Sequence, residues 1–354
     1  MLEKYIKLSY CNNLKISKNN RKILSDRNAF RSYIQNLKSK NIKEENIVDD
    51  QLQISKDGIK LINYHSKEYP YPFKNIPDPP LVFYAQGNLD LLNNLKVAIV
   101  GSRTPNMNNI YLAGELAKFL SDHNITVVSG FAKGIDTVAH QNSMNSTIAV
   151  LGTGFNRIYP KENLSLYNEL KNTGLIISEY PLNTLPLKYN FPKRNRLIAA
   201  LADIVIIIEA QERSGSLITA RFALDYNKDI FSVPGHPLDN KVKGCNMLIK
   251  EGAYMLLDFE EVLEILYRKY PNLQNNVSQN NLHYTKRVKE EERDQSSNED
   301  DILNLISDTG VPAEEIADKL NMDATDLNKS LSKLELSDMI YKDICGNIFR
   351  KYIN

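Results

Sequence analysis

The chain has 354 residues, of which 44 are lysine or arginine and 43 are aspartate or glutamate, so its formal net charge is +1. This length allows two or three domains, and a hydrophobic fraction of 42% with 25% charged residues is ordinary for a soluble globular protein. A balanced charge neither requires nor excludes a polyanionic partner, so only local clusters of charge can indicate one.

Several classes of protein are disfavoured by what the sequence lacks. Cys11, Cys245 and Cys345 are far apart and form no CxxC pair, which argues against a disulfide framework and is typical of the cytoplasm. The first ten residues have no apolar core of a signal peptide, and no apolar run is long enough to cross a bilayer. The five histidines show no metal-ligand spacing, and no GxxxxGK[ST] phosphate loop occurs. We therefore expect a cytoplasmic protein with no cofactor, no metal and no membrane contact.

The N-terminal part predicts a small helical domain followed by two strands. Residues 1–57 are polar, rich in lysine and asparagine, and carry weak helical patterns. The runs "GIKLINY" and "LVFYAQG" predict short strands, and the proline-punctuated stretch between them cannot be a regular element.

Residues 58–268 alternate short apolar runs with helical patterns. The apolar runs lie at 96–101, 125–130, 147–152, 175–180, 203–210 and 229–235. They are continuous rather than alternating, which indicates strands that are buried on both faces. Helices between successive strands imply right-handed crossovers. The region therefore predicts an α/β fold, an extended Rossmann-like core with a doubly wound, mostly parallel sheet.

The composition changes again after this core. Residues 269–298 are polar and without periodicity, which predicts a linker. Residues 299–354 recover helical patterns and end in a hairpin-like tail, as in a C-terminal winged-helix domain. Within residues 299–340 there are eleven acidic and three basic residues, a balance that would repel a phosphate backbone. We therefore expect this domain to contact protein rather than DNA.

Polar segments with glycines stand next to the predicted strands of the core. Ligands of parallel sheets bind beyond the carboxyl ends of the strands, where glycines and helix N-termini favour phosphate groups. The segments "GSR", "SGFAKGID" and "EAQERSGS" have this composition. "GTGFNR" resembles a dinucleotide fingerprint, but Arg157 occupies its third glycine position. The predicted anion-binding residues are Gly101, Ser102, Arg103, Ser129, Gly130, Lys133, Gly134, Ser214, Gly215 and Ser216.

A basic run, "FPKRNR" at residues 191–196, precedes a long apolar stretch. It adds Lys193, Arg194, Asn195 and Arg196 to the predicted site. Cations at the start of a helix oppose its dipole, so a bound anion explains them, whereas the plain alternative is a solvated helix face. His140 is either a base near Asp136 or, more often for such a residue, a packed side chain.

Taken in order, these motifs resemble one family. The string "AIVGSR … VVSGFAKGID … IAVLGTGFNRIYP … FPKRNRLIAAL … SGSLITA … VPG" is similar, over residues 58–268, to the bacterial DNA-processing protein A family, DprA or Smf. The resemblance implies a non-enzymatic protein that binds single-stranded DNA, protects incoming strands during natural transformation and helps to load the RecA recombinase, commonly as a dimer. It also implies that Arg103 and the cations of the basic run contact the DNA backbone, with the loop at 129–134 lining the same pocket.

Two other functions remain as alternatives. Rossmann-like enzymes of the lysine-decarboxylase-like family hydrolyse nucleotides with a PGGxGTxxE motif, whereas this chain has "ERSGSLITA" in the corresponding region. A transcriptional regulator would be suggested by the C-terminal domain alone, and its acidic balance disfavours that function. The N-terminal residues 1–55 lack the glycine-containing turn of many DprA relatives, which argues against a DNA contact there.

Overall fold

The structure is a computed structural model that describes residues 2–10, 24, 26–35, 44–271, 301–306, 310–320, 322–337, 339–343 and 347–351. The chain divides into two compact units, Met1–Lys269 and Tyr270–Asn354. The predicted linker lies outside the described residues except for its first three positions, and Cys11, His283 and Cys345 lie outside them as well.

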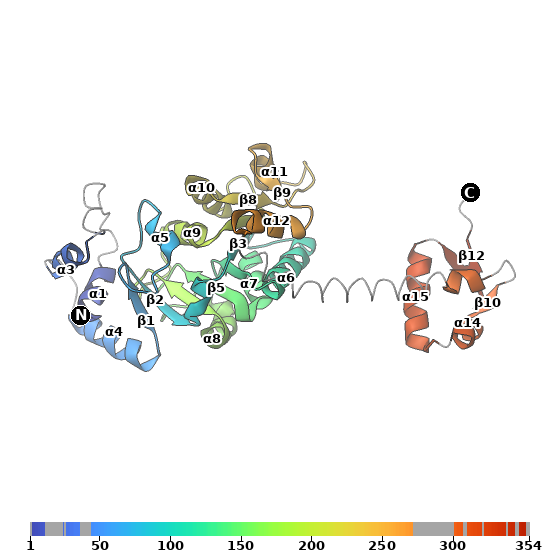
Figure 1. The fold of residues 1–354 in the computed structure, drawn as a ribbon, viewed down its shortest axis with the longest axis horizontal. Coiled ribbons are helices and arrows are strands. Elements are labelled where there is room, and N and C mark those ends of the chain that lie inside the picture. The colour runs from blue at the N-terminus through green and yellow to red at the C-terminus, as the bar shows by residue number, and fades with distance from the viewer. Residues whose placement is uncertain are drawn as a thin grey trace. The chain divides into compact units, whose positions relative to one another are not determined.

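The first unit is built on a nine-stranded sheet (Figure 1). Seven neighbouring strands are parallel, and the first two strands of the chain join them in antiparallel fashion. The order is β1 (Lys60–Asn63), β2 (Val82–Gly87), β6 (Leu175–Ser178), β5 (Thr147–Leu151), β4 (Thr126–Ser129), β3 (Lys96–Gly101), β7 (Ile204–Ile208), β8 (Asp229–Ser232) and β9 (Tyr254–Met255). The predicted mostly parallel, doubly wound sheet is thus confirmed, and β9 is an edge strand that the sequence did not predict.

Helices cover both faces of this sheet, which explains why its strands read as continuous apolar runs. Within β3, Ala98 and Val100 join the core on one face, whereas Val97 and Ile99 join the core on the other. The first face carries α5 (Tyr71–Lys74), α9 (Asn190–Leu201), α10 (Ser216–Asp225) and α11 (Lys243–Lys250). The second face carries α6 (Met107–Asp122), α7 (Ile135–Gln141), α8 (Leu164–Thr173) and α12 (Glu260–Lys269).

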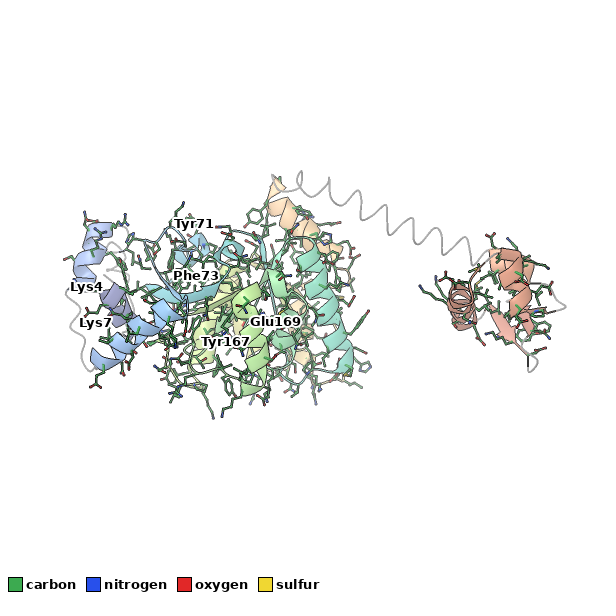
Figure 2. All side chains as sticks on the ribbon, turned by 90° about the horizontal axis from the view of Figure 1, so that it is seen from below. Lys4, Lys7, Tyr71, Phe73, Tyr167 and Glu169 are labelled. Carbon is green, nitrogen blue, oxygen red and sulfur yellow. The ribbon has the colours of Figure 1, made fainter. Side chains whose placement is uncertain are left out.

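The N-terminal helices α1 (Leu2–Tyr10), α3 (Arg27–Gln35) and α4 (Glu44–Lys56) belong to the same compact unit as the sheet. Helix α1 buries Ile6 completely. Its Lys4 is exposed (Figure 2). The Ser9 hydroxyl shares a 2.7 Å hydrogen bond with the hydroxyl of Tyr84 on β2. The short helix α5 repeats this division, since Phe73 is buried and Tyr71 stands at the surface (Figure 2).

The second unit combines helices with a small antiparallel sheet. It contains α14 (Ala313–Leu320), α15 (Ala324–Leu336) and the strands β10 (Val311–Pro312), β12 (Asn347–Arg350) and β11 (Ile340–Lys342), in that order across the sheet. Its core includes the completely buried Ile316, Leu331 and Ile348. The winged-helix assignment stays a prediction. In neither unit is any described helix long and apolar enough to cross a membrane.

Candidate nucleic-acid interface

A cavity lies where the winding of the sheet reverses. From β3 the chain moves outward through β4, β5 and β6, and then returns to the other side of β3 as β7. The helices that follow β3 and β7 pack on opposite faces, so the loops after these two strands diverge and leave a crevice. The crevice holds a cavity of about 540 Å³, which is within the usual size range for a ligand site. It is called the switch-point cavity below.

The switch-point cavity collects half of the residues that the sequence predicts for the site. Gly101 and Arg103 reach it from the loop after β3, and three residues of the "RSGS" segment reach it from the loop after β7. Arg194 and Asn195 join them from the first turns of α9. The predicted residues that line the cavity are Gly101, Arg103, Arg194, Asn195, Ser214, Gly215 and Ser216.

Two exposed cations, Arg103 and Lys188, lie in the lining. Neither forms an ion pair within the part of the chain that the structure describes. Both charges are therefore available to an anionic ligand. The Ser214 and Ser216 hydroxyls, 2.7 Å apart at the start of α10, add polar groups to the same wall.

An aromatic ring borders these cations. The centre of the Phe191 ring lies 5.9 Å from the guanidinium carbons of both Arg103 and Arg194, and 5.5 Å from the ring centre of Tyr159. A Cβ atom on Gly152 would stand 2.7 Å from the Phe191 ring, so the glycine makes room for it. Partly exposed rings beside guanidinium groups provide stacking surfaces that suit any nucleobase.

Arg194 lies in the floor of the cavity rather than at its mouth. Its side chain is buried, and Nη1 donates hydrogen bonds to the backbone carbonyls of Gly130 and Val150. Burial lowers the pKa of Arg194 to about 10, which keeps it charged at neutral pH. The neighbouring carboxylate of Asp136 accepts hydrogen bonds from the amides of Gly130 at 3.0 Å and Ala132 at 3.3 Å, and burial raises the pKa of Asp136.

The comparison with known families decides the identity of the core. The family model described as DNA recombination-mediator protein A matches residues 60–267, which is more than half of the chain. The chain belongs to the DNA recombination-mediator protein A family. The resemblance that the sequence motifs indicated is thus confirmed.

Individual relatives agree with the family match. The chain is 41% identical over 219 residues to the DNA processing protein DprA of Streptococcus pneumoniae, a stretch that covers 60% of this chain and 77% of that protein. It is 33% identical over 291 residues to the protein Smf of Escherichia coli, covering 79% and 74%. A solved structure of DNA processing protein A from Helicobacter pylori, described for its single-stranded DNA binding mode, has a TM-score of 0.56 and 33% identity, covering 60% and 96%. The Streptococcus pneumoniae DprA structure has a TM-score of 0.59 and 34% identity, covering 74% and 92%.

Several glycines of the family motifs pack loops together in this chain. Gly134 has a φ of 77°, and a Cβ there would stand 2.4 Å from the carbonyl oxygen of Ser102. A Cβ on Gly130 would stand 2.7 Å from the Asp136 carboxylate and 2.8 Å from Arg194. The Ser129 hydroxyl is buried and donates a 2.6 Å hydrogen bond to the carbonyl of Ile99. None of Ser102, Ser129, Gly130 and Gly134 lines the switch-point cavity.

Arg196 lies differently from what the sequence predicts. Only 3% of its side chain is exposed, and its Nη2 donates hydrogen bonds of 2.7 and 2.8 Å to the two carboxylate oxygens of Glu179. Its Nε lies 2.8 Å from a carboxylate oxygen of Asp78. These carboxylates neutralise the guanidinium inside the protein, so the expected contact of Arg196 with DNA phosphates is corrected to a buried ion pair.

The other two predicted lysines also lie outside the switch-point cavity. Lys133 is exposed and forms an ion pair with Glu162. Lys193 lies on the far side of the first turn of α9, where it lines a different cavity. The basic run therefore does not act as one patch, because the helix directs its members to different sides.

His140 is a packed side chain, as the plain reading of the sequence held. It is completely buried, its Nδ1 lies 2.7 Å from the Thr147 hydroxyl, and its Nε2 has no hydrogen-bond partner among the described residues. Burial lowers the pKa of His140 to about 3, so the ring is neutral at pH 7. It does not line the switch-point cavity.

Sequence reasoning missed Lys188 and Tyr159 as members of the site. Both lie in irregular loops, and neither directly follows a predicted strand, so the rule that ligands bind beyond strand ends does not point to them. The signal that could have found Lys188 is its position three residues before Phe191, just ahead of the basic run.

Proposed function

We propose that this protein binds single-stranded DNA in the switch-point cavity and acts as a recombination mediator. The observation that carries the proposal is the pairing of two exposed cations, Arg103 and Lys188, with the Phe191 ring in one cavity beyond the sheet. Membership of the recombination-mediator family and the described DNA-binding mode of the Helicobacter pylori relative support it.

The chemistry of the cavity suits a flexible strand. Arg103 can donate two parallel hydrogen bonds to a phosphate, whereas Lys188 acts as a compact point charge. The Phe191 ring offers a face on which any base can stack. A duplex keeps its bases stacked inside and cannot present one to this cavity without unpairing. The arrangement therefore favours single strands and little sequence preference.

The broader role follows the family. We propose that the DNA-bound protein helps to load RecA recombinase and protects incoming strands. We also propose that it is a cytoplasmic homodimer and that it catalyses no reaction. A mediator should accelerate RecA filament growth on single-stranded DNA. Light scattering of the purified chain would measure the oligomeric state.

The binding test uses fluorescence anisotropy with a labelled oligothymidylate at several salt concentrations. Arg103→Ala should weaken binding and reduce the slope of log affinity against log salt by about 0.7, the value for one lost contact to a single-strand phosphate. Lys188→Ala should act in the same direction. Arg221→Ala removes an exposed arginine of α10 that does not line the cavity, and it should bind like the unmodified protein. Unchanged affinity in both Arg103→Ala and Lys188→Ala would refute the site.

A further inference from the structure

A second cavity, of about 600 Å³, lies between the N-terminal helices and the core. Tyr10 at the end of α1 and Asn46 in α4 line one side, and Arg157, Tyr189 and Lys193 line the other. A reciprocal pair of amides, Gln53 and Asn156, joins α4 to the loop that carries Arg157, with one of its hydrogen bonds measuring 2.7 Å. This pairing fixes the residue before Arg157, so the cavity has a defined wall.

The two cavities lie on opposite sides of one wall. In the loop before α8, Tyr159 lines the switch-point cavity and Arg157 lines the second cavity. In the loop before α9, Lys188 lines the first and Tyr189 lines the second. The first turns of α9 divide in the same way, because Phe191, Pro192 and Asn195 line the first cavity, whereas Asn190 and Lys193 line the second. The two cavities therefore adjoin along this wall.

The second cavity offers the same kinds of groups as the first. Arg157 is exposed and forms no ion pair within the described residues, and Lys193 adds a second cation. No aspartate or glutamate is among the described residues that line this cavity. Tyr189 has 68% of its surface exposed, so packing of the core does not require its ring. Cations combined with an exposed ring are what a single-stranded polynucleotide needs from a protein surface.

We propose that the second cavity is a continuation of the DNA site, in which Arg157 and Lys193 contact phosphates and Tyr189 stacks on a base. This inference rests on the proposed function and extends it, because the strand held at Phe191 would pass over the wall toward the N-terminal helices. The N-terminal residues Tyr10 and Asn46 then form the outer side of the site. The length of single-stranded DNA bound by one protein chain is then greater than one cavity can hold.

The test compares a short oligothymidylate of about four nucleotides with a longer one of about twelve, lengths that bracket common single-strand site sizes. With the longer strand, Tyr189→Ala should weaken binding about tenfold, as expected for one lost stacking contact. Arg157→Ala should reduce the salt slope by about 0.7. With the short strand, held in the switch-point cavity, neither change should alter the affinity. Arg103→Ala should weaken binding of both strands.

The matched controls are Arg221→Ala and Tyr111→Ala, which remove an arginine and a tyrosine that are exposed and line neither cavity. If Arg157→Ala and Tyr189→Ala bind the longer strand normally while Arg103→Ala does not, the second cavity is no part of the site and the proposed function stands. If Arg103→Ala also binds both strands normally, the proposed function fails together with its extension. If Tyr189→Ala lost the same affinity for the short and the longer strand, the proposal that the second cavity binds a separate part of the strand would likewise fail.

Discussion

Replacing Arg196 by methionine should destabilise the fold without a selective effect on DNA binding. Arg196→Met leaves the side chain of Glu179, which is 7% exposed, buried without its cation. The side chain of Asp78 is 52% exposed, so water can solvate that carboxylate once the arginine is gone. The loss therefore comes from Glu179, and breaking a buried pair by removing one partner costs about 3–5 kcal/mol.

Urea unfolding measures this loss as a lower midpoint with an unchanged slope. The double variant Arg196→Met/Glu179→Leu removes both charges and should recover most of the stability, since a buried pair replaced by apolar groups is often neutral. DNA affinity of the folded fraction should equal that of the unmodified protein. Weakened DNA binding in Arg196→Met with an unchanged midpoint would contradict the buried ion pair and restore Arg196 as a phosphate contact.

Two further predictions concern the stability of the fold. Because burial lowers the pKa of His140 from 6.5 to about 3, the unfolded chain takes up a proton as the pH falls through 6.5; the stability that the neutral ring contributes is complete above pH 6.5 and is lost toward pH 3. When the pH is lowered from 7 to 5, the unfolding free energy of the His140→Asn variant should therefore fall by about 2 kcal/mol less than that of the unmodified protein. Equal shifts of the urea midpoint in the two proteins would contradict this. Gly101→Ala places a Cβ 1.9 Å from the carbonyl oxygen of Ile208 and should lower the free energy of unfolding by about 1–3 kcal/mol or more. At Gly215 an added Cβ has no described atom within 4 Å, so Gly215→Ala should change this free energy by no more than about 0.5 kcal/mol. Equal unfolding midpoints for the two variants would refute the packing role of Gly101.

The sheet could be predicted because each of its central strands is buried on both faces. All five residues of β7 are buried, and that leaves a continuous run of β-branched residues in the sequence. The edge strand β9 has only two residues, Tyr254 and Met255, and both are exposed. It therefore leaves no apolar run to detect. The antiparallel pairing of β2 with β6 was hidden for another reason, because strand partners far apart in sequence are chosen by tertiary packing.

The convergence of the strand-end segments could be predicted, but the direction of each side chain could not. Residues that follow parallel strands must gather at one edge of the sheet, and Gly101, Arg103 and Ser214 do line one cavity there. The basic run was harder because successive residues of a helix point about 100° apart. Arg196 meets Glu179 and Asp78, which come from other loops, so no local pattern announces its neutralisation.

The electropositive character of the interface thus depends on which cations the fold leaves without a carboxylate partner. Glu179 and Asp78 neutralise Arg196, and Glu162 neutralises Lys133. Arg103 and Lys188 keep their charges at the cavity, whereas the buried Arg194 donates hydrogen bonds to backbone carbonyls and lies beside the Asp136 carboxylate, which lines the same cavity. The chain can therefore be nearly neutral in total and still leave two exposed cations, Arg103 and Lys188, at one cavity.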